Sequence, residues 1–131
     1  MCTCLCKSVV LEIEHNGEFE ACHCGMCRNW GGGPYFAVHC KSYSVVSGEA
    51  SIKSFESSEW ADRGFCADCG THLFYYFKPA NQYVVPLGLL QTENDLSFKQ
   101  QIFIDKKPDS YAFANETEKL TEQQVFDKFG V

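Results

Sequence analysis

The chain has 131 residues, 45% of them hydrophobic and 15% aromatic, which is enough apolar material for one packed core and excludes a disordered chain. We therefore expect a single domain over residues 1–131. The formal net charge of −6 disfavours nucleic acid as a partner, because an acidic surface repels phosphate backbones. No apolar run is long enough for a membrane span or a signal peptide, so we expect a cytoplasmic protein without a membrane partner.

Hydrophobic alternation indicates the first strands. Val9, Leu11 and Ile13 alternate with Val10, Glu12 and Glu14, which predicts a half-buried strand. The Asn-Gly pair at 16–17 is a strong signal for a tight hairpin turn. Residues 19–24 would then form the return strand and bring Cys22 back towards Cys6.

The rest of the chain reads as further strands, which predicts a mainly β protein. The segments 43–46 and 52–55 are expected to pair with each other, and the aromatic run at 72–77 has a high strand preference. The strands predicted after the first hairpin are 35–40, 43–46, 52–55, 72–77, 83–90 and 96–104.

One helix is predicted, at residues 121–129. Thr121 and Gln124 fit a capping box, in which each side chain bonds the backbone amide of the other residue. Apolar side chains at 125, 126 and 129 would form its buried face, and Gly130 is a typical residue to end it.

Nine cysteines in a short chain allow either disulfides or metal sites. A disulfide scaffold needs an export signal and usually an even cysteine count, and this sequence shows neither. Most of the cysteines also cluster two or three residues apart, a spacing suited to sharing one ion. We therefore favour metal ligation, and an all-thiolate ligand set favours zinc.

The Cys-x-x-Cys-Gly sequence at 66–70 predicts a zinc knuckle, in which the glycine lets backbone amides turn towards the thiolates. A knuckle supplies two ligands, whereas a structural zinc site needs four. The partner pair is either Cys4 with Cys6 or Cys2 with Cys4. Such a site would join the start of the chain to its middle and hold the fold.

A second cluster, formed by Cys22, Cys24 and Cys27, offers three thiolates close together in sequence. Three protein ligands leave one tetrahedral position open, as in catalytic zinc sites. Three thiolates also make the ion a weak Lewis acid, so the site suits activation of an incoming thiol better than of a neutral carbonyl. Alternatively, His23, Cys2 or a distant side chain fills the fourth position.

Together these clusters resemble the glutathione-dependent formaldehyde-activating (GFA) family, which includes the centromere-protein-V/GFA domain. The resemblance covers residues 4–109 and also includes Gly48-Glu49 and Gly88. One departure is Lys7, where the family often has glycine. The motifs that carry the resemblance are Cys4-Leu5-Cys6, Cys22-His23-Cys24 with Cys27-Arg28, and the run from Phe65 to Leu73.

The resemblance implies a β-tent fold of stacked antiparallel sheets with zinc knuckles, and two zinc ions per chain. It implies an activity as well, a carbon–sulfur lyase acting in the forming direction, which joins formaldehyde and glutathione to give S-hydroxymethylglutathione. The resemblance leaves Cys2 outside both zinc sites. The implied ligands are Cys4, Cys6, Cys66 and Cys69 for a structural zinc, and Cys22, Cys24 and Cys27 for a catalytic zinc.

Three further residues are candidates for binding the thiol substrate. Arg28 directly follows the open site and suits the carboxylates of glutathione, or else it screens thiolate charge. Trp30 and the glycines around Gly32 would form a pocket wall and an amide surface, or else a plain turn beside a core tryptophan. Arg63 is a second arginine candidate, with an ion pair to Glu59 or Asp62 as the alternative.

The remaining chemistry-bearing residues are expected to be structural. We expect His23 to point away from the metal, and His72 and Cys40 to be packed within strands. An alternative to the enzyme is a non-catalytic zinc-binding domain that binds a partner or a small thiol. A third hypothesis is redox sensing by the thiolates of the open site.

Overall fold

A computed structural model of the chain describes residues 1–129. Within these residues, ten strands and two α-helices are distributed over two compact units. Strand β4 (Tyr35–Ser47) contributes to both units, and the single domain expected from the sequence stays a prediction. Unit 1 comprises Met1–Gly17 and Val38–Asp95, and unit 2 comprises Glu18–Ala37 and the chain from Leu96 onward.

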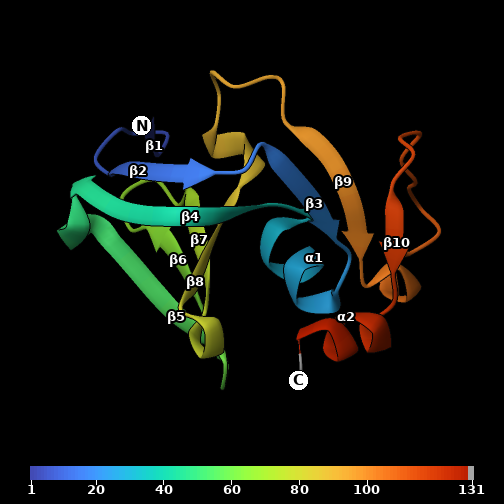
Figure 1. Cartoon of the computed structure of the whole chain (residues 1–131). Coiled ribbons are helices and arrows are strands. Elements are labelled where there is room, and N and C mark those ends of the chain that lie inside the picture. The colour runs from blue at the N-terminus through green and yellow to red at the C-terminus, as the bar shows by residue number, and fades with distance from the viewer. Residues whose placement is uncertain (130–131) are drawn as a thin grey trace. The chain divides into compact units, whose positions relative to one another are not determined.

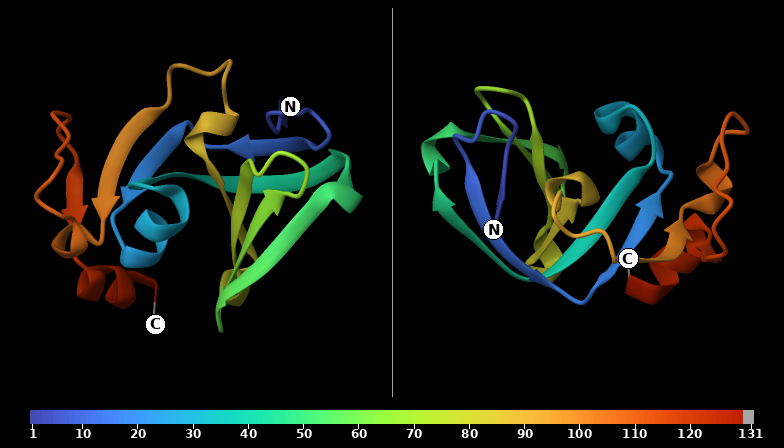
Figure 2. Two further views of the ribbon diagram at one scale, coloured as in Figure 1. Left: turned by 180° about the vertical axis from the view of Figure 1, so that it is seen from behind. Right: turned by 90° about the horizontal axis from the view of Figure 1, so that it is seen from above.

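Unit 1 is built mainly from antiparallel strand pairs. Strand β1 pairs with β2, and β2 with β4. Strands β5 to β8 pair in chain order and lie side by side (Figure 2). Besides β4, the strands of this unit are β1 (Cys2–Thr3), β2 (Val10–His15), β5 (Ile52–Ser58), β6 (Ala61–Cys66), β7 (His72–Phe77) and β8 (Gln82–Pro86).

The core of unit 1 lies on the inward faces of these strands. Val9, Leu11 and Leu73 are fully buried, as the alternation of apolar residues requires. The rings of Tyr43 and Tyr83 stack with centroids 3.9 Å apart. Aromatic side chains therefore supply much of the packing in this unit.

Unit 2 combines parallel and antiparallel pairing. Strand β3 pairs antiparallel with the first residues of β4 and parallel with β9, and β9 pairs parallel with β10 (Figure 1). Half-buried phenylalanines pack together in this unit, where the ring of Phe98 stacks on Phe19 and meets Phe113 edge-on. Besides β4, the elements are β3 (Glu18–Cys22), α1 (Gly25–Gly31), β9 (Ser97–Ile102), β10 (Glu118–Leu120) and α2 (Glu122–Phe129).

Two of the predicted strand pairings are wrong. Strands β2 and β3 do not form a hairpin, because β2 pairs with β1 and β4 while β3 pairs with β4 and β9. The segment 43–46 belongs to β4 and pairs with β2, whereas 52–55 pairs with β6. A strand has only two edges, and other strands occupy both edges of β2 and of β3.

Some elements were not predicted, and others differ in length. Helix α1 has seven residues and a glycine at each end, which gives it a weak helical pattern. Strand β8 ends at Pro86, where the sequence predicted a strand to 90, because proline has no amide to continue the ladder. Residues Leu87–Leu89 form a 3-10 turn instead.

The predicted C-terminal capping box is confirmed. The amide of Gln124 donates to Thr121 Oγ1 at 3.2 Å, and the amide of Thr121 donates to Gln124 Oε1 at 2.7 Å. Val125 is buried, whereas Phe129 is 49% exposed. Gly130, expected to end the helix, lies outside the described residues. None of the helices within residues 1–129 has the length and apolar character needed to cross a membrane.

Candidate metal centres

Four cysteine sulfurs of unit 1 converge in one place. The Sγ atoms of Cys4, Cys6, Cys66 and Cys69 all lie within 4.8 Å of one another. Cys6 Sγ is 3.6 Å from that of Cys4 and 3.9 Å from that of Cys66. Tetrahedral zinc with Zn–S bonds of about 2.3 Å requires sulfur separations of about 3.8 Å, so these residues fit the ion.

The first half of this cluster is a tight turn. The amide of Lys7 donates to the carbonyl of Cys4 at 3.0 Å, and the amide of Val9 donates to Cys4 Sγ at 3.3 Å. Lys7 has φ 67°, in the left-handed region that favours glycine. Lysine in place of the family's glycine therefore strains the backbone at this position, but the turn is still formed. The hydroxyl of Ser8 lies 3.0 Å from Cys6 Sγ.

The second half is the predicted knuckle. Gly70 has φ 78°, and its amide donates to the carbonyl of Cys66 at 2.8 Å. Thr71 Oγ1 lies 3.1 Å from Cys69 Sγ and accepts a hydrogen bond from the amide of Leu5 at 3.0 Å. The Thr71 hydroxyl and amide lower the pKa of Cys69 to about 6, which favours the thiolate that a metal needs.

Three cysteine sulfurs of unit 2 form the second cluster. Cys22 ends strand β3, Cys24 caps helix α1, and Cys27 lies in its first turn, with all three Sγ atoms within 4.8 Å. The amide of Cys27 donates to Cys24 Sγ at 3.4 Å. The neighbouring sulfurs of Cys24 and Cys27, together with burial, hold the pKa of Cys22 well above its usual range. A divalent cation would offset the repulsion that full ionisation of the trio requires.

His23 lies between two of these cysteines but does not join them. It is fully buried, its Nδ1 lies 2.8 Å from the hydroxyl of Tyr111, and its Nε2 lies 2.8 Å from Gln101 Oε1. Burial lowers the pKa of His23, so the ring is neutral. Both ring nitrogens are engaged, and His23 does not supply a fourth ligand. No other His, Asp or Glu among the described residues of unit 2 lies with the trio as a fourth ligand either.

The three candidate substrate residues lie on or beside helix α1. Arg28 is half-buried, and its Nε donates to the carbonyl of His23 at 2.9 Å. The ring of Trp30 lies 6.0 Å from that of Tyr35. Gly32 has φ 84° and ends the helix, with its amide donating to the carbonyl of Arg28 at 2.8 Å. This amide is therefore committed to the helix end.

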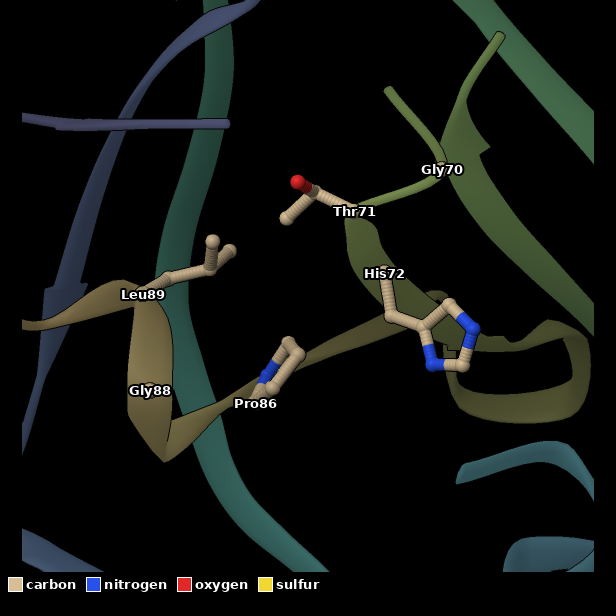
Figure 3. A pocket seen from close by; sticks show the side chains of 6 residues that line it. All are labelled: Gly70, Thr71, His72, Pro86, Gly88 and Leu89. Carbon is tan, nitrogen blue, oxygen red and sulfur yellow. The ribbon is translucent and has the colours of Figure 1, made fainter. Parts of the chain in front are cut away.

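Unit 1 also contains an open cavity of about 360 Å³ beside the second knuckle (Figure 3). His72 was expected to be packed within its strand, but it is half-buried and lines this cavity. The other lining residues are Gly70, Thr71, Pro86, Gly88 and Leu89.

The other candidates have structural surroundings. All nine cysteines are free thiols, which excludes the disulfide alternative in this structure. Cys40 is buried in β4, as expected for a small apolar residue, and Cys2 is buried in β1. Arg63 is buried as well, with its Nε 3.2 Å from Ser57 Oγ and its guanidinium 4.9 Å above the ring of Tyr75. Asp62, the expected partner of Arg63, contacts Lys78.

Comparison with known proteins gives the family. The family described as glutathione-dependent formaldehyde-activating enzyme (GFA) matches residues 1–106. The chain belongs to the GFA family. The matched residues include both cysteine clusters and Arg28, whereas Tyr111 lies beyond them.

Two relatives agree with this membership. A protein of Schizosaccharomyces pombe, described as an uncharacterized lyase, is 36% identical over 124 residues, which is 93% of this chain and 90% of that protein. A crystal structure of a Rhodobacter sphaeroides protein matches with a TM-score of 0.62 at 26% identity, over 71% of this chain and 89% of that chain. The mainly β fold is thus confirmed, and a GFA-type, lyase-type enzyme is supported.

The residues around the cysteine clusters were harder to predict than the clusters themselves. Ser8 and Thr71 are neighbours of cluster cysteines in sequence, so proximity alone is a usable signal for them. Gln101 and Tyr111 lie some eighty residues from His23, at sequence separations of 78 and 88, and no local pattern indicates them.

Proposed function

We propose that this GFA-family protein is a zinc enzyme that joins a small thiol, with glutathione as the best fit, to a small aldehyde such as formaldehyde. The product would be S-hydroxymethylglutathione or a related adduct, so the enzyme is a carbon–sulfur lyase acting in the forming direction. The observation that carries the proposal is the trio of Cys22, Cys24 and Cys27, which offers three ligands and no fourth among the described residues of unit 2. The family's name supports the choice of substrates.

The two cysteine clusters would have different tasks. Cys4, Cys6, Cys66 and Cys69 would hold a structural zinc ion with all four positions filled. Cys22, Cys24 and Cys27 would hold a zinc ion that binds a thiol in its open position and lowers the thiol's pKa. Nine free thiols also suit a reducing compartment such as the cytoplasm.

The proposed reaction needs no oxidant or reductant. The thiol sulfur attacks the carbonyl carbon of the aldehyde and a carbon–sulfur bond forms. The electron pair of the carbonyl π bond moves to oxygen, and the proton lost by the thiol ends on that oxygen as a hydroxyl. The protein's part is to keep the thiol deprotonated and hold it in place for the small aldehyde.

Arg28 is placed to bind a carboxylate of the thiol. Its Nε is held by the carbonyl of His23, which leaves the two terminal nitrogens as a donor pair. Because Arg28 follows Cys27 directly, a carboxylate bound there would bring the attached thiol towards the trio. Trp30 and Gly32 are proposed to border the same ligand.

The reaction is tested by exchange NMR of formaldehyde and glutathione with zinc-loaded protein. We expect faster adduct formation than in buffer, and loss of that acceleration in Cys24→Ser. Cys40→Ser is the matched control, because Cys40 lies outside both clusters and should change neither rate nor zinc content. Absence of acceleration by the fully loaded wild type would overturn the named reaction.

Zinc counting separates the enzyme from a non-catalytic zinc domain. If the trio holds a functional ion, Cys24→Ser should release one of two zinc ions and leave the fold intact. Cys69→Ser should instead unfold the protein. If both substitutions unfold it equally, the trio is structural and the alternative is favoured. For Arg28→Gln, we expect a KM for glutathione raised at least about 10-fold, and less change for a thiol without carboxylates.

A further inference from the structure

We propose that Tyr111 and Gln101 are positioning residues for the Cys22, Cys24 and Cys27 cluster, and that they act through His23. The inference rests on the proposed metal at this trio, but it concerns how the chain holds its ligands rather than which reaction follows. It assigns a task to Tyr111, which lies outside the residues matched by the family.

The His23 ring is fixed from two sides. Gln101 Nε2 donates to Thr117 Oγ1 at 2.9 Å, which orients the amide so that Oε1 faces His23 Nε2. His23 Nε2 therefore carries the proton and donates to Gln101. The opposite nitrogen, Nδ1, is then an acceptor, and the Tyr111 hydroxyl donates to it. Four residues thus form one chain of hydrogen bonds with defined directions.

The backbone of His23 is fixed as well. Its amide donates to the carbonyl of Ile102 at 3.1 Å, and its carbonyl accepts from Arg28 Nε at 2.9 Å. The residue therefore makes four hydrogen bonds, two from the ring and two from the backbone. One of these partners, Arg28, is the residue proposed to bind the substrate.

This residue controls the geometry of its two neighbours. Cys22 and Cys24 are the residues on either side of His23 in the chain. A change in the backbone angles of His23 would therefore separate their sulfurs. The ring is fully buried, and an unpaired nitrogen there would destabilise this arrangement rather than be tolerated. Groups that hold a metal ligand in place commonly determine how tightly the ion is held, and here the hydrogen bonds fix the residue between two ligands. A fully apolar core residue at 23 would fill the space without fixing the direction of either cysteine.

The test measures metal binding at each cluster, without thiol or aldehyde. Co²⁺ is titrated into metal-free protein, and its sulfur-to-metal absorption is followed in wild type and in Tyr111→Phe. We expect the affinity of the trio to fall by about 10- to 100-fold, with an altered absorption spectrum, and the affinity of the four-cysteine cluster to stay unchanged. Gln101→Leu removes the bond on the other side of the ring and should shift the trio in the same direction.

Tyr76→Phe is the matched control, because its hydroxyl bonds Asn81 within unit 1 and does not belong to the His23 chain. Equal affinities and identical spectra in wild type, Tyr111→Phe and Gln101→Leu would overturn the proposal, as would equal weakening of both clusters. Loss of ion binding in the two variants supports the proposal even if wild type forms no adduct from formaldehyde and glutathione. That last result would reject the proposed reaction alone.

Discussion

The hydroxyl of Thr71 accepts a hydrogen bond of 3.0 Å from the amide of Leu5 and lies 3.1 Å from Cys69 Sγ. A single side chain thus connects the turn that carries Cys4 and Cys6 to the knuckle that carries Cys66 and Cys69. The contact spans 66 residues of sequence, so it links the start of unit 1 to its middle independently of any metal.

Removing this hydroxyl should weaken both the turn and the metal site. For Thr71→Val, we expect about 0.5–1.5 kcal/mol lower stability, because the Leu5 amide loses a solvent-exposed hydrogen bond. The zinc affinity of the four-cysteine cluster should fall about 10-fold, because the pKa of Cys69 rises from about 6 towards its usual value. Urea unfolding and chelator competition measure the two effects. Thr71→Ser keeps the hydroxyl, and a loss as large as that in the valine variant would contradict the assignment.

Gly48 should not tolerate any side chain. A Cβ at this position would lie 1.8 Å from the carbonyl oxygen of Ser8, and Gly48 has φ 84°. Both effects act on backbone that cannot move aside easily, so we expect Gly48→Ala to destabilise the protein by about 3 kcal/mol or more. The matched control is Gly33→Ala, because a Cβ there meets nothing within 4 Å. Equal unfolding midpoints in urea would show that the close approach is not required.

Replacing Lys7 with glycine, the residue that the family often has there, should stabilise the protein. Its φ of 67° costs a side chain about 1–2 kcal/mol, and glycine avoids that strain but loses about 0.5–1 kcal/mol in chain entropy. We therefore expect Lys7→Gly to stabilise the protein by about 0.5–1 kcal/mol in thermal or urea unfolding. Lys7→Ala retains the strain and should be close to wild type. A gain from alanine equal to that from glycine would point to charge rather than backbone strain.

Cys40 should be unreactive in the folded protein. Burial raises its pKa from 9.0 to about 12, so at about pH 9 only about one molecule in a thousand carries the thiolate. Iodoacetamide at this pH, followed by peptide mass spectrometry, should label Cys40 in urea and leave it unlabelled in native protein. Rapid native labelling would contradict its burial.

The same shift predicts a dependence of stability on pH. A pKa that is higher in the folded state than in the unfolded one contributes stability that is fully present below pH 9.0 and lost as the pH rises towards about 12. The free energy of unfolding should therefore fall across this range. The decline should be smaller in Cys40→Ala, and an unchanged slope would assign it to other groups.

The sequence by itself determined what depends on short spacing. The paired cysteines, the glycine of the second knuckle and the capping box of Thr121 all involve residues within a few positions of each other, so local chemistry specifies them. The aromatic strand at 72–77 was predicted with its observed bounds for the same reason. The need for a partner pair for Cys66 and Cys69 followed from the ligand count, and only the family resemblance indicated Cys4 and Cys6 rather than Cys2 and Cys4.

Only the tertiary structure decided the features that depend on distant partners. The Asn-Gly pair at 16–17 predicts a hairpin, but β2 and β3 both use their edges for other strands, so the local signal is overridden. The partners of His23 also depend on the tertiary structure. Its position between two cysteines suggests that its side chain faces away from them, but it does not indicate which residues the side chain contacts. Its partners Tyr111 and Gln101 come from chain segments that local sequence does not place, since side-chain hydrogen bonds across 78 and 88 residues arise only once the strands have paired.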